Sequence, residues 1–235
     1  MKTLILAAGL GKRLGLEDTP KPMYRVLRKP ILEHNLLLLK KHGMTDICIT
    51  LHYKGNVIKD YFKDGSNWGV KIQYSSEKEL LGTAGALLNV RWFLGKESFF
   101  IIYGDNYTDI NLKEMLSFHL THKPIATIAL FDPKKSLNSG IAGGKVLLDK
   151  DNNLLSFIEG KQDEINGYVN AGIYIVEPQI LELIPKDKPS DFGKDIFPKL
   201  LKEGLKLKGY ITDGFVFAID TIEALRVVEE ALRRK

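Results

Sequence analysis

The sequence predicts a three-layer α/β fold in which helices cover both faces of a mostly parallel, mixed sheet. Short apolar runs alternate with amphipathic segments from residue 4 to residue 131, and this alternation is typical of βαβ units. Each unit takes a right-handed crossover by default. No internal repeat, low-complexity segment or linker divides the 235 residues, so we expect one domain over residues 1–235.

The first half of the chain gives the clearest elements. Leu4–Ala7 predicts a strand buried on both faces, and Gly43 marks the end of a helix over Ile31–Lys41. Val70–Tyr74 alternates as a half-buried strand does, and the very apolar run Phe99–Tyr103 predicts a central strand. The other elements expected here are strands at Asp46–Leu51 and Ile125–Phe131 and helices at Asn56–Phe62, Gly85–Val90 and Leu112–His122.

The second half is less regular, with turns between its expected strands. Apolar runs there predict strands, and longer amphipathic segments predict helices. The strands expected are Lys145–Leu148, Leu154–Ile158 and Tyr168–Val176, and the helices are Pro178–Ile184, Phe192–Lys202 and Thr221–Arg234.

Composition narrows the class of protein. The net charge of +5 fits either an ordinary solvated surface or an enzyme that attracts polyanionic substrates. No basic run with interleaved aromatics predicts nucleic-acid binding, and no apolar stretch reaches the roughly 18 residues of a membrane span. The single cysteine, Cys48, excludes an intrachain disulfide. Without a signal-peptide pattern, we expect a cytoplasmic protein with no membrane partner.

A glycine-rich loop with two cations follows the first strand. Gly9 and Gly11 let the backbone pass close to a ligand, with N–H groups able to hold phosphate oxygens. Lys12 and Arg13 supply the positive charge that a triphosphate needs. The spacing matches neither a Walker A loop nor the dinucleotide fingerprint. Taken alone, the loop fits a plain turn with a solvated Lys–Arg pair equally well.

A second basic element follows at Pro20–Met23. The two prolines flanking Lys21 predict an extended segment that aims its ammonium group. Leu6–Leu14 followed by Pro20–Met23 resembles the signature of sugar-1-phosphate nucleotidyltransferases, although the spacing from Arg13 to Lys21 is shorter than is usual there. The resemblance implies a Rossmann-like nucleotidyltransferase fold. It also implies nucleotide contacts from Leu6, Ala7, Ala8, Gly9, Gly11, Lys12 and Arg13.

The similarity extends to the family's base-binding turn at Leu81–Leu87. It implies that Gly82 and Thr83 contact the nucleotide and that the glycines allow close approach of base and ribose. Glu77 stands where relatives place a residue that contacts the base edge. A carboxylate accepts hydrogen bonds only, which suits the N1–H and amino group of guanine. Some uridylyltransferases also carry glutamate here.

The resemblance also implies a magnesium site. Asp105 follows Gly104 at the end of an expected central strand, where relatives bind the ion, and Mg²⁺ usually takes one or two carboxylates. Gly104 itself is expected to contact the nucleotide. The second carboxylate is expected at Asp220, by similarity of Asp213–Thr221 to the cytidylyltransferase pattern. Another alignment places Ala218 there, and Asp220 also fits a helix N-cap.

Three further segments resemble sugar-binding parts of the family. Asn170 and Gly172 match an Asn-x-Gly contact, and asparagine offers both donor and acceptor to hydroxyls. Gly140 lies in the counterpart of a sugar-contacting loop. Glu159 matches a residue that binds sugar hydroxyls. Lys161 stands one residue later than the family's phosphate-binding lysine, so either the loop delivers Lys161 or this contact is lost.

The implied reaction joins a nucleoside triphosphate to a sugar 1-phosphate and releases pyrophosphate, with Arg13, Lys21 and Asp105 as catalytic residues. Glu77–Gly85 looks most like guanylyltransferases acting on mannose- or heptose-type phosphates, so GTP is the expected nucleotide. The C-terminal Ile219–Thr221 looks more like cytidylyltransferases. Cytidylyl or uridylyl transfer to another sugar or alditol phosphate therefore stays open. The product would feed nucleotide-sugar and cell-surface polysaccharide biosynthesis.

Two other classes of protein are alternatives. A metal-dependent glycosyltransferase would usually carry Asp-x-Asp, whereas Asp105-Asn106-Tyr107 lacks the second aspartate. A non-catalytic nucleotide-sugar-binding regulatory subunit would not need Arg13 and Lys21. Assembly into a homo-oligomer is left open by the sequence, and no appended domain is expected after the C-terminal segment.

Overall fold

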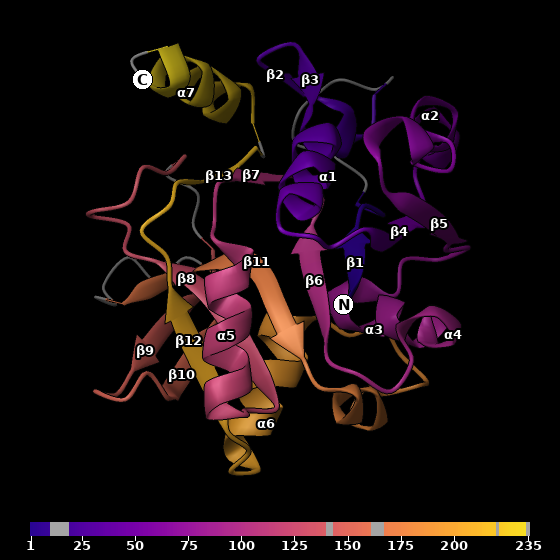
Figure 1. Cartoon of the computed structure of the whole chain (residues 1–235). Coiled ribbons are helices and arrows are strands. Elements are labelled where there is room, and N and C mark those ends of the chain that lie inside the picture. Colours follow the sequence, from indigo (N-terminus) through magenta and orange to yellow (C-terminus); the bar gives the residue numbers. More distant parts are fainter. Residues whose placement is uncertain (10–18, 140–142, 161–166, 220, 234–235) are drawn as a thin grey trace.

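The structure, a computed structural model, describes residues 1–9, 19–139, 143–160, 167–219 and 221–233. A nine-stranded sheet forms its centre (Figure 1), in the order β10-β9-β11-β6-β1-β4-β5, while β8 pairs with β11 and β12 with β8. The strands are β1 (Lys2–Leu6), β4 (Asp46–Leu51), β5 (Lys71–Ser76), β6 (Phe99–Tyr103), β8 (Ala126–Phe131), β9 (Lys145–Leu148), β10 (Leu154–Ile158), β11 (Tyr168–Val176) and β12 (Leu207–Ile211).

Seven of the nine strands described in this sheet point the same way, which confirms the expected mostly parallel, mixed sheet. β1 is parallel to β4 and β6, and β4 is parallel to β5. β11 is antiparallel to β6, β8 and β9, while β10 is antiparallel to β9 and β12 is parallel to β8. Strands β11 and β10 therefore run against the other seven. Because β11 lies beside β6, its first residues lie at the edge where β6 ends.

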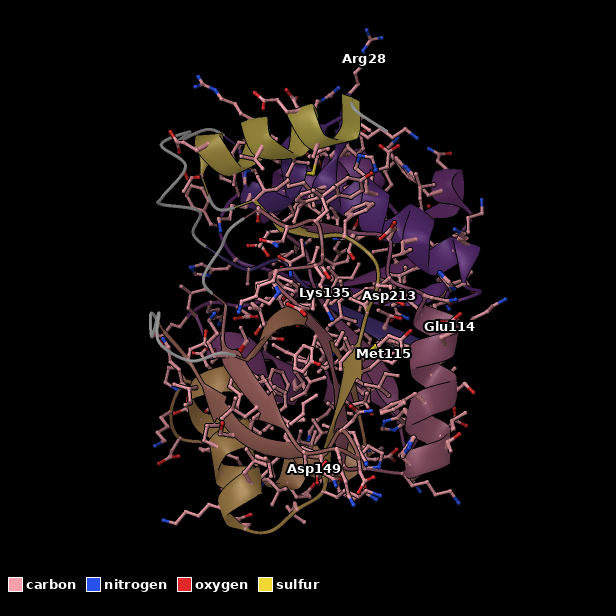
Figure 2. All side chains as sticks on the ribbon, turned by 90° about the vertical axis from the view of Figure 1, so that its left-hand side faces the viewer. Arg28, Glu114, Met115, Lys135, Asp149 and Asp213 are labelled. Atoms are coloured by element: carbon pink, nitrogen blue, oxygen red, sulfur yellow. The ribbon has the colours of Figure 1, made fainter. Side chains whose placement is uncertain are left out.

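Helices cover both faces of the sheet, which confirms the three layers. One face carries α1 (Ile31–Lys41), α2 (Gly55–Phe62) and α5 (Leu112–His122), and the other carries α3 (Gly82–Asn89), α4 (Arg91–Leu94) and α6 (Phe197–Lys202). Successive side chains of β6 point to opposite faces of the sheet, so the strand contributes to two separate apolar clusters. Phe100 packs on the first face and Phe99 on the second. Met115 of α5 is buried against the sheet, whereas Glu114 lies on the exposed side of the helix (Figure 2).

A smaller apolar cluster joins the C-terminal helix to the N-terminal half. β7 (Asn106–Thr108) and β13 (Val216–Ala218) form an antiparallel ribbon, and β2 (Arg25–Val26) and β3 (Lys29–Pro30) form a hairpin. Phe215 and Phe217 pack with Tyr24 and with Val228 of α7 (Ile222–Arg233). The ribbon therefore holds the segment before α7 against the residues that follow β6. Within the described residues, no helix is both long and apolar enough to cross a bilayer.

Most predicted elements are confirmed, and α1, β4, β6, α5, β9, β10 and β11 have the predicted bounds. The helix expected at Pro178–Ile184 is a 3-10 helix over Pro178–Glu182. The helix expected over Phe192–Lys202 begins as a π-helix over Phe192–Ile196, because the Ile196 N–H bonds to the Asp191 carbonyl five residues earlier. The short strands β2, β3, β7, β12 and β13 were not predicted.

The extended segment expected around Lys21 was wrong. Lys21–Met23 forms a 3-10 helix, in which the Met23 N–H donates to the Pro20 carbonyl at 2.8 Å. Proline fits the first turn of a helix, because its fixed φ is helical and its missing N–H has no partner there. A helical turn therefore aims the Lys21 side chain.

Candidate active site

A cavity of about 440 Å³ opens at the edge where β6 ends and β11 begins. This is the edge where open α/β sheets bind ligands. Six of the residues that the sequence singles out line it: Lys21, Thr83, Asp105, Glu159, Asn170 and Gly172. Gly11, Lys12, Arg13, Gly140, Lys161 and Asp220 lie outside the described residues.

The reversed direction of β11 brings two distant segments together. Ile173 pairs with Ile102, so Asn170–Gly172 lies beside the residues that follow Tyr103. The Asn106 amide donates to the Ala171 carbonyl at 2.8 Å. Gly172 has a φ of +68°, and a Cβ there would lie 2.5 Å from Asn106 Nδ2. The contact therefore requires glycine at this position.

Lys21 and Asp105 form an ion pair on the cavity wall. Lys21 Nζ donates to Asp105 Oδ2 at 3.2 Å, and the two side chains are 10% and 29% exposed. Both groups are thus largely withdrawn from bulk water, which strengthens their electrostatic interaction with any third charge in the cavity. The pair can receive a phosphate on the lysine and a cation on the carboxylate.

The segment before α7 also reaches this wall. The Ile219 N–H donates to the Asp105 carbonyl at 3.2 Å, and Ala218 pairs with Asn106 in the β7–β13 ribbon. Ala218 also exchanges hydrogen bonds with the Ser139 hydroxyl. The alternative alignment would place the second metal ligand at Ala218, which lines the cavity but has no carboxylate. No group of three metal-binding side chains occurs among the described residues.

Glu159 lies at the other end of the cavity, enclosed by two glycines. A Cβ on Gly144 would lie 2.8 Å from Glu159 Oε2, and one on Gly193 only 2.2 Å from it. Burial raises the pKa of Glu159, an effect that Lys194 opposes and Asp191 increases. This end of the cavity therefore combines acceptor carboxylates with one ammonium group, a set suited to hydroxyl-rich ligands.

Glu77 lies outside the cavity lining and directly follows β5, the strand that pairs with β4. Its Oε2 accepts the Leu81 N–H at 3.3 Å, whereas the buried Oε1 has no hydrogen-bond partner among the described residues. Burial raises the pKa of this carboxyl, and the Leu81 N–H and His52 oppose the shift. A half-satisfied buried carboxylate is costly unless a donor reaches it.

The first turn of α3 packs against residues from the C-terminal half. Gly82 has a φ of +76°, and a Cβ there would lie 2.4 Å from the Ser190 carbonyl oxygen. The Ala84 and Gly85 N–H groups donate to that same oxygen at 2.9 and 3.0 Å. The sequence suggested that Gly82 makes room for a nucleotide. The structure explains this glycine by its close packing on Ser190.

The remaining described residues of the predicted nucleotide site gather at the same edge of the sheet. Leu6, Ala7, Ala8 and Gly9 end or follow β1, and the Gly104 N–H donates to the Leu6 carbonyl at 2.9 Å. The Ala7 N–H donates to the Thr50 hydroxyl at 3.3 Å. The ends of β1, β4 and β6 are thus fixed to one another beside the cavity.

Several cavity residues were not predicted from the sequence, among them the polar residues Tyr103, Asn106, Asp191 and Lys194. Tyr103 and Asn106 flank the predicted Gly104-Asp105, so a wider window around that motif would have included them. Asp191 and Lys194 belong to a segment with no local sign of a ligand site. Their position depends on the packing of that segment against α3.

Two characterised relatives are similar to most of this chain. A UTP–glucose-1-phosphate uridylyltransferase from Synechocystis sp. is 34% identical over 87% of this chain and 56% of that protein. The mannose-1-phosphate guanylyltransferase catalytic subunit beta from Drosophila pseudoobscura pseudoobscura is 33% identical over 86% of this chain and 54% of that protein. The chain thus spans about half the length of these relatives.

Solved structures also match over nearly the whole chain. The crystal structure of HddC from Yersinia pseudotuberculosis complexed with GMP-PN has a TM-score of 0.82 and 28% identity. The match covers 98% of this chain and 99% of that one. Residues 2–225 match the sequence profile of the family described as nucleotidyl transferase. This match spans all the described segments that build the cavity, and the chain belongs to the nucleotidyl transferase family.

Proposed function

We propose that the chain transfers the guanylyl group of GTP to a sugar 1-phosphate of the mannose or heptose type and releases pyrophosphate. The observation that carries the proposal is the Lys21–Asp105 ion pair in a cavity that also holds Glu159 and Asn170. One end of the cavity suits a phosphate, and the other suits hydroxyl groups. Family membership supports the chemistry. The GMP-PN complex of HddC and the Drosophila guanylyltransferase support the choice of GTP.

In the proposed reaction, an oxygen of the sugar phosphate attacks the α-phosphorus of GTP in line. The new P–O bond forms as the bond to the β-phosphate breaks, and pyrophosphate leaves. A phosphate monoester is already ionised, so no side-chain base is needed. The chain's task is orientation and charge neutralisation. Lys21 donates to the phosphate oxygens from the cavity wall, and we assign the departing phosphates to Arg13.

The donor set at Asp105 fits Mg²⁺. This ion takes one or two carboxylates and completes its shell with water and phosphate oxygens. Asp105 lines the cavity, and Ile219, the residue before Asp220, bonds to the Asp105 backbone. We therefore assign the two carboxylates to Asp105 and Asp220. When bound, the ion supplies positive charge that neutralises the phosphates.

The choice of guanine rests on Glu77. Its buried Oε1 has no hydrogen-bond partner in the described part of the chain, and guanine presents two adjacent donors, N1–H and the amino group. Uracil presents a single N–H between two carbonyl groups, which suits a carboxylate less well. The relationship to the Synechocystis uridylyltransferase makes UTP with glucose 1-phosphate the second candidate pair.

A grid of the four nucleoside triphosphates against mannose, heptose and glucose 1-phosphates, with Mg²⁺, tests the proposal by pyrophosphate release. We expect the highest kcat/KM for GTP with the mannose or heptose phosphate. Fastest turnover with UTP and glucose 1-phosphate would overturn the substrate assignment and keep the reaction. No release for any pair, together with tight binding of a nucleotide sugar, would overturn the enzyme assignment in favour of a regulatory subunit.

A further inference from the structure

Lys194 lines the cavity at its Glu159 end and has no part in the reaction steps described above. Among the described residues of the cavity lining, Lys21 and Lys194 are the two that carry a positive charge. Lys21 is already paired with Asp105. The reaction brings two anionic substrates together, so the cavity must neutralise the acceptor phosphate as well as those of the nucleotide. Lys194 is the cation that the described part of the wall offers for this second group.

The turn that carries Lys194 packs directly against Glu159. Phe192–Ile196 is a π-helix, and a Cβ on Gly193 within it would clash with Glu159 Oε2. Glycine therefore lets the turn approach the carboxylate closely, and the next residue in the turn is Lys194. The positive charge of Lys194 accordingly opposes the rise in the Glu159 pKa that burial causes. An ammonium group and a carboxylate thus share this part of the cavity wall.

Contacts with α3 hold this turn in place. Asp191 Oδ1 accepts the backbone N–H and the hydroxyl of Thr83, each at 3.1 Å. The Thr83 hydroxyl in turn accepts the Phe192 N–H at 2.9 Å. The Asp191 N–H donates to Asp195 Oδ2 at 2.7 Å, inside the turn itself. The start of the π-helix is therefore fixed both by α3 and by its own first residues, and Lys194 extends from a defined backbone.

The ammonium group of Lys194 is held much more loosely than its backbone. Lys194 Nζ lies 4.0 Å from Asp191 Oδ2, and the two side chains are 67% and 38% exposed. That distance is too long for a hydrogen bond, and an exposed ion pair of this kind contributes little to stability. A phosphate dianion can therefore draw the ammonium group away from Asp191 at little cost. The flexible four-carbon stem gives the group the reach to follow.

We propose that Lys194 binds the phosphate of the sugar 1-phosphate while Glu159 and Asn170 bind its hydroxyl groups. A sugar 1-phosphate carries a dianion close to its hydroxyls, and Glu159 and Asp191 alone would repel that charge. Lys194 supplies the opposite charge at the end of the cavity that suits hydroxyl groups. An uncharged sugar gains nothing from the ammonium group, so Lys194 selects the phosphorylated form. This assignment of Lys194 rests on the proposed function.

Steady-state kinetics of Lys194→Met test the proposal on the substrate pair that the wild type turns over fastest. We expect KM for the sugar 1-phosphate to rise about tenfold, the effect of losing one charge-assisted hydrogen bond, with KM for the nucleotide unchanged. Lys194→Arg keeps the positive charge and should restore most of the affinity. Lys199→Met is the control, because it removes a similarly paired lysine of α6 that lies outside the cavity lining.

Equal rises of both KM values, or unchanged KM values in Lys194→Met, would overturn the assignment. A larger rise in KM for the sugar phosphate in Lys161→Met would also overturn it and give the phosphate to Lys161.

Calorimetric titration with mannose 1-phosphate or glucose 1-phosphate, in the presence of Mg²⁺ and a non-hydrolysable GTP analogue, needs no turnover. We expect about tenfold weaker binding to Lys194→Met and unchanged binding to Lys199→Met. This result without turnover of any substrate pair by the wild type would overturn the proposed function and keep Lys194 as an anion-binding residue. Turnover by the wild type together with equal binding by the wild type and Lys194→Met would overturn the role of Lys194 alone.

Discussion

At the scale of single residues, Lys21 and Asp105 carry the proposed chemistry, and local sequence identified both. Lys21 stands between two prolines and Asp105 follows a glycine after an apolar strand, so each is marked by its neighbours. Asp191 has no such mark. Its contact with Thr83 joins residues 108 positions apart, and no local pattern encodes a contact of that kind. The nucleotide contact expected at Gly82 stays a prediction, and the structure shows in addition that this glycine packs against the Ser190 backbone.

Removing the ammonium group of Lys21 tests its role. Lys21→Met keeps much of the side-chain length, and we expect kcat to fall by about 10² to 10³-fold because transition-state charge loses one donor in a partly buried site. Pyrophosphate release measures the loss, and circular dichroism checks the fold. Lys29→Met, which removes the same charge from a half-exposed side chain paired with Glu33, is the control. Near-normal turnover of Lys21→Met would refute the assignment.

The raised pKa of Glu77 predicts a pH dependence of stability. The folded protein holds the Glu77 proton to a higher pH than the unfolded chain, whose carboxyl titrates near 4.5. Above that pH the folded state binds more protons, so this residue's contribution to the free energy of unfolding falls as pH rises through the raised pKa. Glu77→Gln removes that contribution. The stability of the variant relative to wild type should therefore increase with pH.

Urea unfolding of both proteins at several pH values above 4.5 measures the difference. Glu79→Gln changes an exposed carboxylate two residues away and should follow the wild-type curve. If the free energy of unfolding changes with pH in the same way for Glu77→Gln and wild type, burial does not raise the pKa of Glu77.

At the scale of elements, segments with a clear periodic or apolar pattern of their own were predictable, and the two- and three-residue strands were not. α1 and α5 carry their own pattern and obtained their bounds from it. β7 and β13 have three residues each, too few for a period, and they exist because they pair with each other. The π-helix before α6 likewise depends on where Asp191 is held.

The start of α3 gives a prediction with a matched control. Gly82 and Gly43 have φ values of +76° and +80°, but a Cβ on Gly43 meets nothing within 4 Å. Gly43→Ala should therefore cost about 1 kcal/mol for the backbone conformation alone. Gly82→Ala should cost about 2 kcal/mol more, because Ser190 must also move. Urea denaturation measures both losses. Equal losses would mean that α3 and Ser190 are not closely packed.

At the scale of the whole molecule, we propose that residues 1–235 form one cooperative domain. β11, from the second half of the chain, lies between β6 and β8, and the sheet is continuous across the two halves. The absence of a linker in the sequence predicts one domain. The structure adds a physical reason, since neither half of the described sheet is complete without the other.

Equilibrium unfolding in urea tests this proposal. The two tryptophans, Trp68 and Trp92, both lie in the N-terminal half, where Trp68 packs against Tyr61 and Phe62. Tryptophan fluorescence therefore reports that half, while far-UV circular dichroism reports the whole chain. We expect the two transitions to coincide, as they do for a two-state protein. A fluorescence transition at a lower or higher urea concentration than the dichroism transition would divide the chain into two units.

The packing of Ser190 and Asp191 on α3 has a consequence for biosynthesis. Three N–H groups in the first turn of that helix, those of Thr83, Ala84 and Gly85, are satisfied by these two residues. While the chain is being made on the ribosome, α3 emerges long before its cap does. The helix start must wait for more than a hundred later residues before its N–H groups find their native partners. A nascent chain stopped before Ser190 would thus contain the sequence of this turn without its native hydrogen bonds.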